Sequence, residues 1–429
     1  MLDSYFKLSE NGVTVRTEVL AGITTFLTMA YIIFVNPLIL TDAGMDRDAV
    51  FMATCFAAAI GTLIMGLYAN YPIALAPGMG LNAYFTYGVV LGMGFSWQVA
   101  LGAVFISGVL FLLLSVFRTR EWIINAVPKS LKLAVSAGIG MFLAIIALKN
   151  AGIVQDHQAT LVTVGDMTSA PALLATVGFI VIIVLNFKKV PGAIIIGIIL
   201  ATAIGIVFGV SPFNGVVASP PSMAPTLLQF DLAGAFQIGL VTIVFAFLFV
   251  DLFDTAGTLI GIAHRAGLLD EQGRLPRIRK ALIADSVATM AGAAMGTSTT
   301  TSYIESAAGV NAGGRTGLTA VTVAILFVAA IVLSPLATTI PAYATAPALL
   351  FVACIMARGL AEIDWDDVTE YAPAVVTAFA MPFTFSIATG IGFGFITYAA
   401  IKILSGRTSE ASPAVIVIAL AFGVKFAIL

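Results

Sequence analysis

A run of six hydroxyl side chains, Thr297 to Ser302, leads to a carboxylate at Glu305 inside an otherwise apolar stretch. Two more carboxylates, Asp251 and Asp254, interrupt the apolar segment FVDLFDTAGTL. An ionisable group at the centre of a bilayer costs about 2.5–3.5 kcal/mol on insertion scales, so each of these residues requires a reason. Carboxylates in such places can bind a polar substrate or carry a proton, because burial and a neighbouring like charge both favour the protonated form.

The spacing of the two aspartates predicts a shared helix face. Asp254, Thr255 and Thr258 lie three, four and seven residues after Asp251. A helix would place these four residues on one side. This arrangement indicates a polar stripe that could hold a proton.

The hydroxyl run is predicted to break its helix. Extended backbone at membrane depth survives only where it is buried in protein or lines a wet cavity. We expect 297–301 to be extended and a half-helix to begin near Ser302, with its free N–H groups and positive dipole end directed inward. The Gly/Pro-rich APGMGL (76–81) should do the same, with Asn82 near the start of its own half-helix. Two helix N-termini would then face a small polar cavity with carboxylates on its walls.

Structural roles compete with these functional ones. Ser302 and Glu305 have the spacing of a capping box, in which Glu305 only caps its own helix. Asp254 could support the hydroxyl run instead of binding a ligand, and Asn82 could be a simple N-cap. Asp285, one turn into the following span, is interpreted as an ion-pair or packing residue.

The composition is that of an integral membrane protein. Of 429 residues, 60% are hydrophobic and 10% are charged. The net charge of -2 and the lack of a basic tract argue against nucleic acid as a partner. Cys55 and Cys354 lie in apolar runs without metal-site spacing, and the two histidines form no HExxH motif. We therefore expect no metal, no cofactor and no enzymatic activity.

Apolar runs between charged or Gly/Pro-rich breaks predict fourteen membrane spans. They lie at 15–39, 49–69, 72–91, 97–117, 130–150, 170–187, 190–210, 233–257, 281–295, 301–313, 316–335, 344–360, 368–386 and 388–404. The run 412–428 could be a fifteenth span or a helix on the membrane surface. With a cytoplasmic N-terminus, most of the 20 Lys and Arg residues fall in inward loops, as the positive-inside rule requires. The sequence therefore predicts a multi-pass protein of the bacterial inner (plasma) membrane.

Fourteen spans divide into two halves of seven, and an odd number makes the halves run in opposite directions. The third span of each half is the interrupted one: YPIALAPGMGLNAYFTYGVV in the first half and the hydroxyl run in the second. Interrupted segments in corresponding positions are the best sequence pointer to a transporter's binding site. The sequence thus predicts an all-α polytopic fold with a 7+7 inverted repeat, in which spans 3 and 10 are broken and contain short extended stretches.

Four motifs together resemble the AzgA-like purine permeases of the nucleobase–cation symporter-2 family: TTFLTMAYIIFVNP, ALAPGMGLNAYF, FVDLFDTAGTL and GTSTTTSYIESAAGVNAGGRTGLTA. The resemblance covers nearly the whole chain. It implies a core domain and a gate domain that move against each other in alternating access. The core would comprise 14–117 and 233–335, the gate 129–210 and 344–404, and a C-terminal tail would occupy 405–429.

The resemblance also implies a binding site between the eighth span and the two broken spans. The substrate-binding acid of span 8 corresponds to Asp251, the span-10 glutamate to Glu305 and the span-3 asparagine to Asn82. Thr255 stands where the uracil branch has a histidine, so a carboxylate must carry the proton. The proton-coupling candidates are Asp251, Asp254 and Glu305. At the two breaks, Gly80, Thr301 and Ser302 complete the substrate-binding candidates, and Phe85 and Phe253 are candidates for stacking on the base.

The predicted function is secondary active transport: proton-coupled symport of purine nucleobases into the cell. Guanine and hypoxanthine are favoured over adenine. The expected partners are a purine base, a proton and the lipid bilayer, and the oligomeric state is open, with a homodimer as one option. The alternative is an anion exchanger of the same fold, of the sulfate or bicarbonate type, since helix N-termini alone attract anions. The acids on the cavity wall argue against this alternative.

Overall fold

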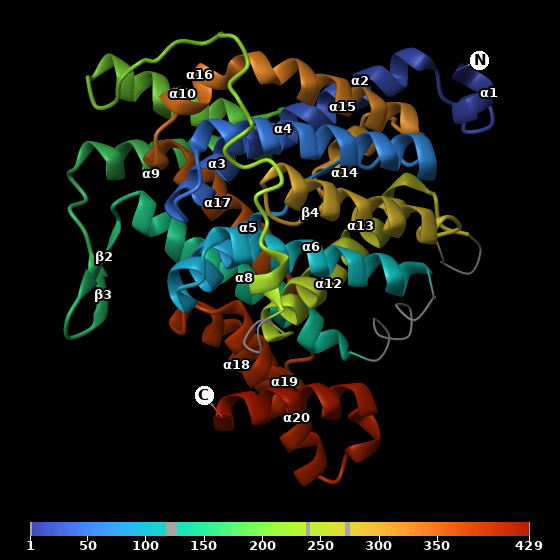
Figure 1. Cartoon of the computed structure of the whole chain (residues 1–429), viewed down its shortest axis with the longest axis vertical. Coiled ribbons are helices and arrows are strands. Elements are labelled where there is room, and N and C mark those ends of the chain that lie inside the picture. Colours follow the sequence, from blue (N-terminus) through green and yellow to red (C-terminus); the bar gives the residue numbers. More distant parts are fainter. Residues whose placement is uncertain (1, 117–126, 237–240, 271–274, 429) are drawn as a thin grey trace.

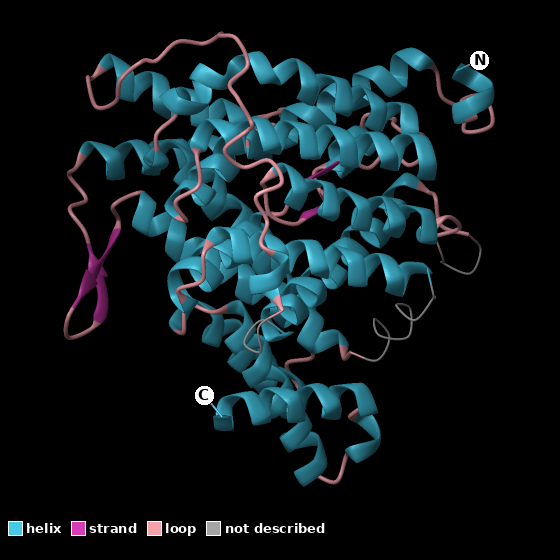
Figure 2. Cartoon of the chain, viewed as in Figure 1, coloured by secondary structure: helices cyan, strands magenta, loops and turns pink. Residues whose placement is uncertain are grey.

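The computed structural model describes residues 2–116, 127–236, 241–270 and 275–428. Many apolar helices lie side by side in one bundle (Figure 1). Figure 2 shows strands in two places only within the described ranges: inside the bundle and in a hairpin that protrudes from it. The elements in chain order are α1 (Leu2–Phe6), α2 (Val15–Met29), α3 (Ile32–Asp42), α4 (Arg47–Ile64), η1 (Met65–Ala69), β1 (Leu75–Pro77), α5 (Met79–Ala83), η2 (Tyr84–Gly92), α6 (Trp97–Val116), α8 (Lys129–Asn150), β2 (Val154–His157), β3 (Leu161–Val164), α9 (Ala170–Phe187), α10 (Ala193–Val207), α11 (Leu232–Ala235), α12 (Val241–Ala266), α13 (Ile278–Met295), β4 (Thr300–Ser302), α14 (Ser306–Asn311), α15 (Gly317–Ala329), η4 (Ala330–Leu333), α16 (Ser334–Thr339), α17 (Ala342–Ala357), η5 (Arg358–Glu362), α18 (Val368–Phe383), α19 (Ile387–Leu404), η6 (Thr408–Glu410) and α20 (Pro413–Ile428).

The described residues contain nine helical segments long and apolar enough to cross a bilayer. Two shorter apolar helices, Ala193–Val207 and Pro413–Ala427, accompany them. Helical segments of the described ranges coincide with each of the predicted spans, although the number fourteen itself stays a prediction. The eighth span differs most: its helix α12 runs over Val241–Ala266, whereas the sequence pattern predicted 233–257. The apolar run begins before the helix because the short helix α11 is apolar too.

The two interrupted spans meet inside the bundle as a two-stranded ladder. β1 pairs antiparallel with β4, with Leu75 opposite Ser302 and Pro77 opposite Thr300. The ladder continues at both ends, because Gly78 N donates to Thr299 O and Tyr303 N donates to Ala74 O. Each break thus satisfies the backbone groups of the other, as buried backbone requires. The predicted extended stretches are confirmed.

The start of the second half-helix was predicted wrongly. Ser302 lies in β4, and α14 begins only at Ser306. The hydroxyl run stays extended further than expected because its neighbours provide partners for its backbone. Thr289 Oγ1, on α13, donates to Thr300 O at 2.9 Å, for example.

Helices far apart in the sequence support the ladder from both sides. Thr62 Oγ1, on α4, accepts from Leu75 N at 2.8 Å and donates to Leu75 O at 2.9 Å. Asn36, on α3, donates to Thr297 Oγ1 at 2.8 Å and to Thr54 Oγ1 at 2.7 Å. These buried hydroxyl and amide groups explain why a polar run is tolerated at this depth.

The remaining helices pack in two sets. α13 packs against α4 and α6, and α15 packs against α2 and α4. In the second set, α17 and α18 pack against α8, and α9 packs against α17. The division into a core and a gate domain remains a prediction. α12 touches both sets, since it contacts α6, α13, α8 and α19. The candidate residues on α12 therefore lie where the two sets meet.

Candidate functional site

α12 presents two different faces. Asp251, Thr255 and Thr258 are buried on one side. Asp254 is exposed, and so are Gly257, Ile260 and Gly261 beyond it. Asp254 lies three residues after Asp251, as the predicted shared face requires, but it is exposed whereas Asp251 is buried, so the polar stripe runs from the buried to the exposed side of α12.

The exposed side of α12 has free space beside it, which we call the opening. Asp254, on this side, lies within electrostatic range of Asp285 and Glu305. A Cβ atom added at Gly257 or Gly261 would meet no atom within 4 Å. Ile304, next to Glu305, is 47% exposed.

The buried face of α12 joins a network of carboxylates and hydroxyls. The hydroxyls of Thr255 and Thr301 are 2.7 Å apart. Thr255 Oγ1 lies 2.9 Å from Asp285 Oδ2 and 3.4 Å from Asp251 Oδ1. Ser302 Oγ donates to Asp285 Oδ1 at 3.1 Å. Since one hydroxyl donates only one hydrogen, Thr255 can serve one aspartate at a time.

Asp285 belongs to this network and is fully buried. The sequence interpretation as an ion-pair or packing residue missed that role. The signal was present, because Asp285 lies in an apolar helix together with Ser286 and Thr289, a polar set that a helix buried only for packing would not need. Asp285 thereby links α13 to both α12 and β4.

Glu305 does not cap its own helix. It occupies the N-cap position of α14, yet its side chain makes no capping hydrogen bond, and Ser302 donates to Asp285 instead. Tyr31 donates its hydroxyl to Glu305 Oε1 at 2.6 Å. Tyr31 lies between α2 and α3, at the interruption of the first span. The capping-box alternative is wrong, and the half-buried Glu305 remains available to the opening.

Asn82 carries an amide group that is not fully satisfied. It lies inside α5, whose N-cap is Gly78, so the simple N-cap interpretation is wrong. Its Oδ1 accepts from Ser298 Oγ at 2.5 Å. Its Nδ2 is buried and has no hydrogen-bond partner in the part of the chain that the structure describes. An unpaired buried donor is costly unless a ligand or water serves it.

The other predicted residues have different surroundings. Gly80 lies against α8, where an added Cβ would overlap Cγ2 of Ile139. Phe85 is fully buried in the main hydrophobic cluster. The side chain of Phe253 lies outside the described residues. Thr301 and Ser302 line the buried network described above.

A further carboxylate escaped the sequence analysis. Glu18, in the first span, is fully buried. It accepts from the backbone N–H groups of Arg315, Thr316 and Thr319 and from the Thr319 hydroxyl. Glu18 therefore caps the N-terminus of α15 from another helix, a structural use of a membrane carboxylate.

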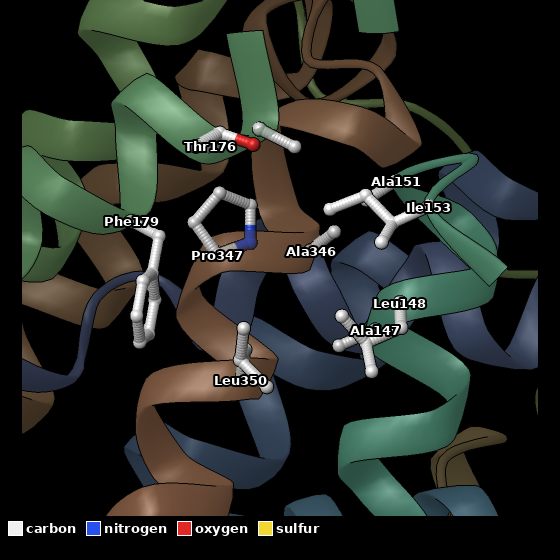
Figure 3. Close-up of a pocket in the computed structure, with 10 residues that line it drawn as sticks. Ala147, Leu148, Ala151, Ile153, Thr176, Phe179, Ala346, Pro347 and Leu350 are labelled. Atoms are coloured by element: carbon white, nitrogen blue, oxygen red, sulfur yellow. The ribbon is translucent and has the colours of Figure 1, made fainter. Parts of the chain in front are cut away.

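A cavity lies apart from this network, between α8, α9 and α17 (Figure 3). Its volume is about 190 Å³. Figure 3 shows it lined by alanines, Leu148, Ile153, Phe179, Pro347 and Leu350, with Thr176 as the polar exception. The Thr176 hydroxyl donates to Ala172 O of its own helix. This cavity lacks the polar groups that would orient a hydrogen-bonding substrate.

Comparison with known proteins identifies the family. The sequence model of a family of the xanthine/uracil permease type, described as "Permease family", matches residues 16–393 of this chain. The chain belongs to this family. Adenine permease AdeP of Escherichia coli strain K12 is 49% identical over 425 residues, which cover 99% of this chain and 96% of AdeP. Guanine/hypoxanthine permease PbuG of Bacillus subtilis is 45% identical, with 96% of each chain covered. Putative permease MJ0326 of Methanocaldococcus jannaschii is 54% identical over 426 residues, with 99% and 98% covered.

Solved structures share the fold of this permease. The transmembrane domain of the cyanobacterial bicarbonate transporter BicA superimposes with a TM-score of 0.64 at 16% identity, over 89% of this chain and 97% of that one. The murine Slc26a9 anion transporter in the inward-facing state gives 0.67 at 11% identity, over 91% and 69%. The predicted inverted-repeat fold class and the predicted family are thereby confirmed, with the exact number of spans still a prediction, and the chain is a multi-pass membrane permease, not an enzyme.

Proposed function

We propose that this permease transports purine nucleobases through a site between α12 and the two broken spans. The observation that carries the proposal is the set of unlike groups gathered there: the carboxylates of Asp251 and Glu305 and the unpartnered Nδ2 of buried Asn82. A purine has N–H donors and ring-nitrogen or carbonyl acceptors on one flat edge. Carboxylates accept from the donors, and an amide N–H₂ donates to the acceptors. The names of the relatives support the same substrate class.

Proton coupling is assigned to the carboxylates. Asp254 and Glu305 border the opening and lie within electrostatic range of each other. A proton bound by one of them would remove their mutual repulsion, so proton and base can occupy the site together. Asp251 remains a third candidate, linked to the same site through Thr255.

Guanine and hypoxanthine are proposed as the favoured bases. Guanine offers two adjacent N–H donors, which match the two oxygens of one carboxylate. Adenine is the second candidate, because the adenine permease AdeP is 49% identical and PbuG is 45% identical to this chain.

The arrangement supports an opening toward the cytoplasm. With the N-terminus inside the cell and the chain in the inner membrane, α12 runs from outside to inside, so the exposed face from Asp254 to Gly261 leads to the cytoplasmic half. On the other half, Phe249 of α12 contacts Phe395 of α19, with ring centroids 5.3 Å apart. Contact on one half and an opening on the other correspond to one state of an alternating-access cycle.

The anion-exchanger alternative rests on fold alone, because the similar anion transporters are 11–16% identical. Carboxylates around the site would repel an anion. Uptake of radiolabelled guanine, hypoxanthine, adenine and sulfate, in cells lacking their own carriers and with or without a protonophore, tests the proposal. Uptake of a purine that the protonophore abolishes is expected. Sulfate uptake without purine uptake would contradict it.

A further inference from the structure

The apolar helix α20 lies beyond residues 16–393, which the family model matches, and takes no part in the proposed transport site. It follows α19 after the short connection 405–412. We infer that α20 is a membrane-embedded, antiparallel partner of α19 that crosses the bilayer. Its two ends then lie on opposite faces of the membrane, and it covers the boundary between α19 and α12. This inference does not depend on the substrate or on the coupled ion.

The connection before α20 is fixed by charges at the end of α19. Glu410 pairs with Lys402 at 2.7 Å and with Arg407 at 2.7 Å. Lys402 also pairs with Glu370 at 2.7 Å, and Arg407 pairs with Asp367 at the start of α18. These groups form a polar end of the helical hairpin, where water and headgroups can solvate them.

The other end of α20 packs deep along α19. A Cβ atom added at Gly392 would lie 2.6 Å from Phe422 Cδ1 and 3.0 Å from Phe426 Cε2, so the glycine permits close approach of the two helices. Gly392 lies ten residues before Lys402, or about 15 Å along a helix axis. A helix lying across the polar end could not reach that depth.

Phe422 also reaches the core helix α12. Its ring centroid lies 6.3 Å from that of Phe245, six residues before Asp251. Phe245 stacks on Phe249, which contacts Phe395 of α19. α20 thus completes an aromatic contact between α12 and α19 on the half of the molecule opposite to the polar end.

The opposite side of α20 suits hydrocarbon. Val417, Leu420 and Val424 are 57–64% exposed and follow helical spacing, whereas Val415 and Phe422 are buried. Lys425 lies near the far end, where its long side chain can extend to the interface. Figure 1 shows the end of α20 directed toward the side of the β2–β3 hairpin, away from the side of the N-terminus.

The test is the accessibility of single cysteines on the full chain, with Cys55 and Cys354 replaced by alanine. One variant carries Ser405→Cys in the connection, and the other carries a cysteine on a short hydrophilic extension after Leu429. Intact cells are labelled with a membrane-impermeant maleimide, before and after membrane disruption. We expect the extension to be labelled in intact cells and Ser405→Cys only after disruption.

A second measurement checks the packing. In the same background, Phe245→Cys with Phe422→Cys should form a crosslink, whereas Phe245→Cys with Val417→Cys, on the exposed stripe, should not. Labelling of both single cysteines from the same side, or equal crosslinking of both pairs, would overturn the inference. Because the two cysteines are compared with each other, an error in the absolute orientation would reverse both results and leave the inference intact.

Discussion

At the scale of residues, the site depends on carboxylates held by hydroxyls. Asp285 accepts from Thr255 and Ser302, and Tyr31 donates to Glu305. Buried groups of this kind are sensitive to change, because removing one partner leaves the other unsatisfied at a cost of about 1–3 kcal/mol. Each interaction can therefore be tested by a substitution that preserves the volume of the side chain.

Asp285→Asn should lower purine uptake about tenfold or more. The hydroxyls of Thr255 and Ser302 donate to the two separate oxygens of Asp285, whereas an asparagine side chain has only one oxygen acceptor. The matched control is Ser286→Ala, whose hydroxyl donates to Leu282 O of its own helix. Initial uptake rates, normalised to the amount of protein in the membrane, provide the measurement. Normal uptake by Asp285→Asn would show that its network is dispensable.

Tyr31→Phe removes the hydroxyl that donates to Glu305 and nothing else. We expect the apparent affinity for the purine to fall by about tenfold, since a hydrogen bond to a charged group contributes about 1.5–3 kcal/mol. Tyr87→Phe is the control, because Tyr87 donates to a distant carboxylate, Asp42, at 2.6 Å. If uptake by Tyr31→Phe and by Tyr87→Phe depends on the purine concentration in the same way, Tyr31 has no role in substrate binding.

At the scale of elements, the crossing of the broken spans depends on close approach. Gly80 lies in the first turn of the first half-helix, α5, against Ile139 of α8. Sequence reasoning treated Gly80 as a substrate contact, and the structure adds a second role, contact between the two sets of helices. Only glycine leaves room for that contact.

Gly80→Ala should therefore slow transport several-fold, and the additional change Ile139→Ala should restore it by making room. Gly423→Ala, where an added Cβ meets nothing within 4 Å, serves as the control. Uptake by the single and double variants is compared. A double variant as slow as Gly80→Ala would indicate that Gly80 acts through the substrate rather than through packing.

The elements also show which features of the fold could be predicted from the sequence. Composition and apolar runs predicted the membrane class, the interrupted spans and their extended stretches, because each follows from local chemistry. The start of α14 and the two faces of α12 depend on partners from segments distant in the sequence, such as Ala74 for Ser306. Glu18 was missed for the same reason, since its partner Arg315 lies 297 residues away.

At the scale of the whole molecule, charges outside the membrane hold three helices together. Hydrogen bonds from Thr369 and Arg407 lower the pKa of Asp367 below its usual value, and those from Lys402 and Arg407 lower the pKa of Glu410. Groups with a lowered pKa stabilise the fold above their ordinary pKa values, and that contribution is lost as the pH falls through the lowered ones.

The melting temperature of the purified protein should therefore fall as the pH decreases below about 4. Arg407→Gln should flatten this dependence, because it removes a partner that both carboxylates share. Lys7→Gln, at an exposed pair with Glu10, is the control. Thermal unfolding between pH 3 and pH 6 provides the comparison, and identical curves for Arg407→Gln and the unchanged protein would contradict this role.

The central claim is that a purine binds beside Glu305, between α12 and the broken spans. Equilibrium binding of radiolabelled guanine, hypoxanthine and adenine to the purified protein tests it most directly. The comparison includes Glu305→Gln and the control Glu362→Gln, an exposed carboxylate 3.4 Å from Lys129. The account predicts saturable binding of at least one base that Glu305→Gln weakens about tenfold or more and Glu362→Gln leaves unchanged. Unaltered binding by a folded Glu305→Gln variant, or no binding of any purine to the unchanged protein, would contradict it.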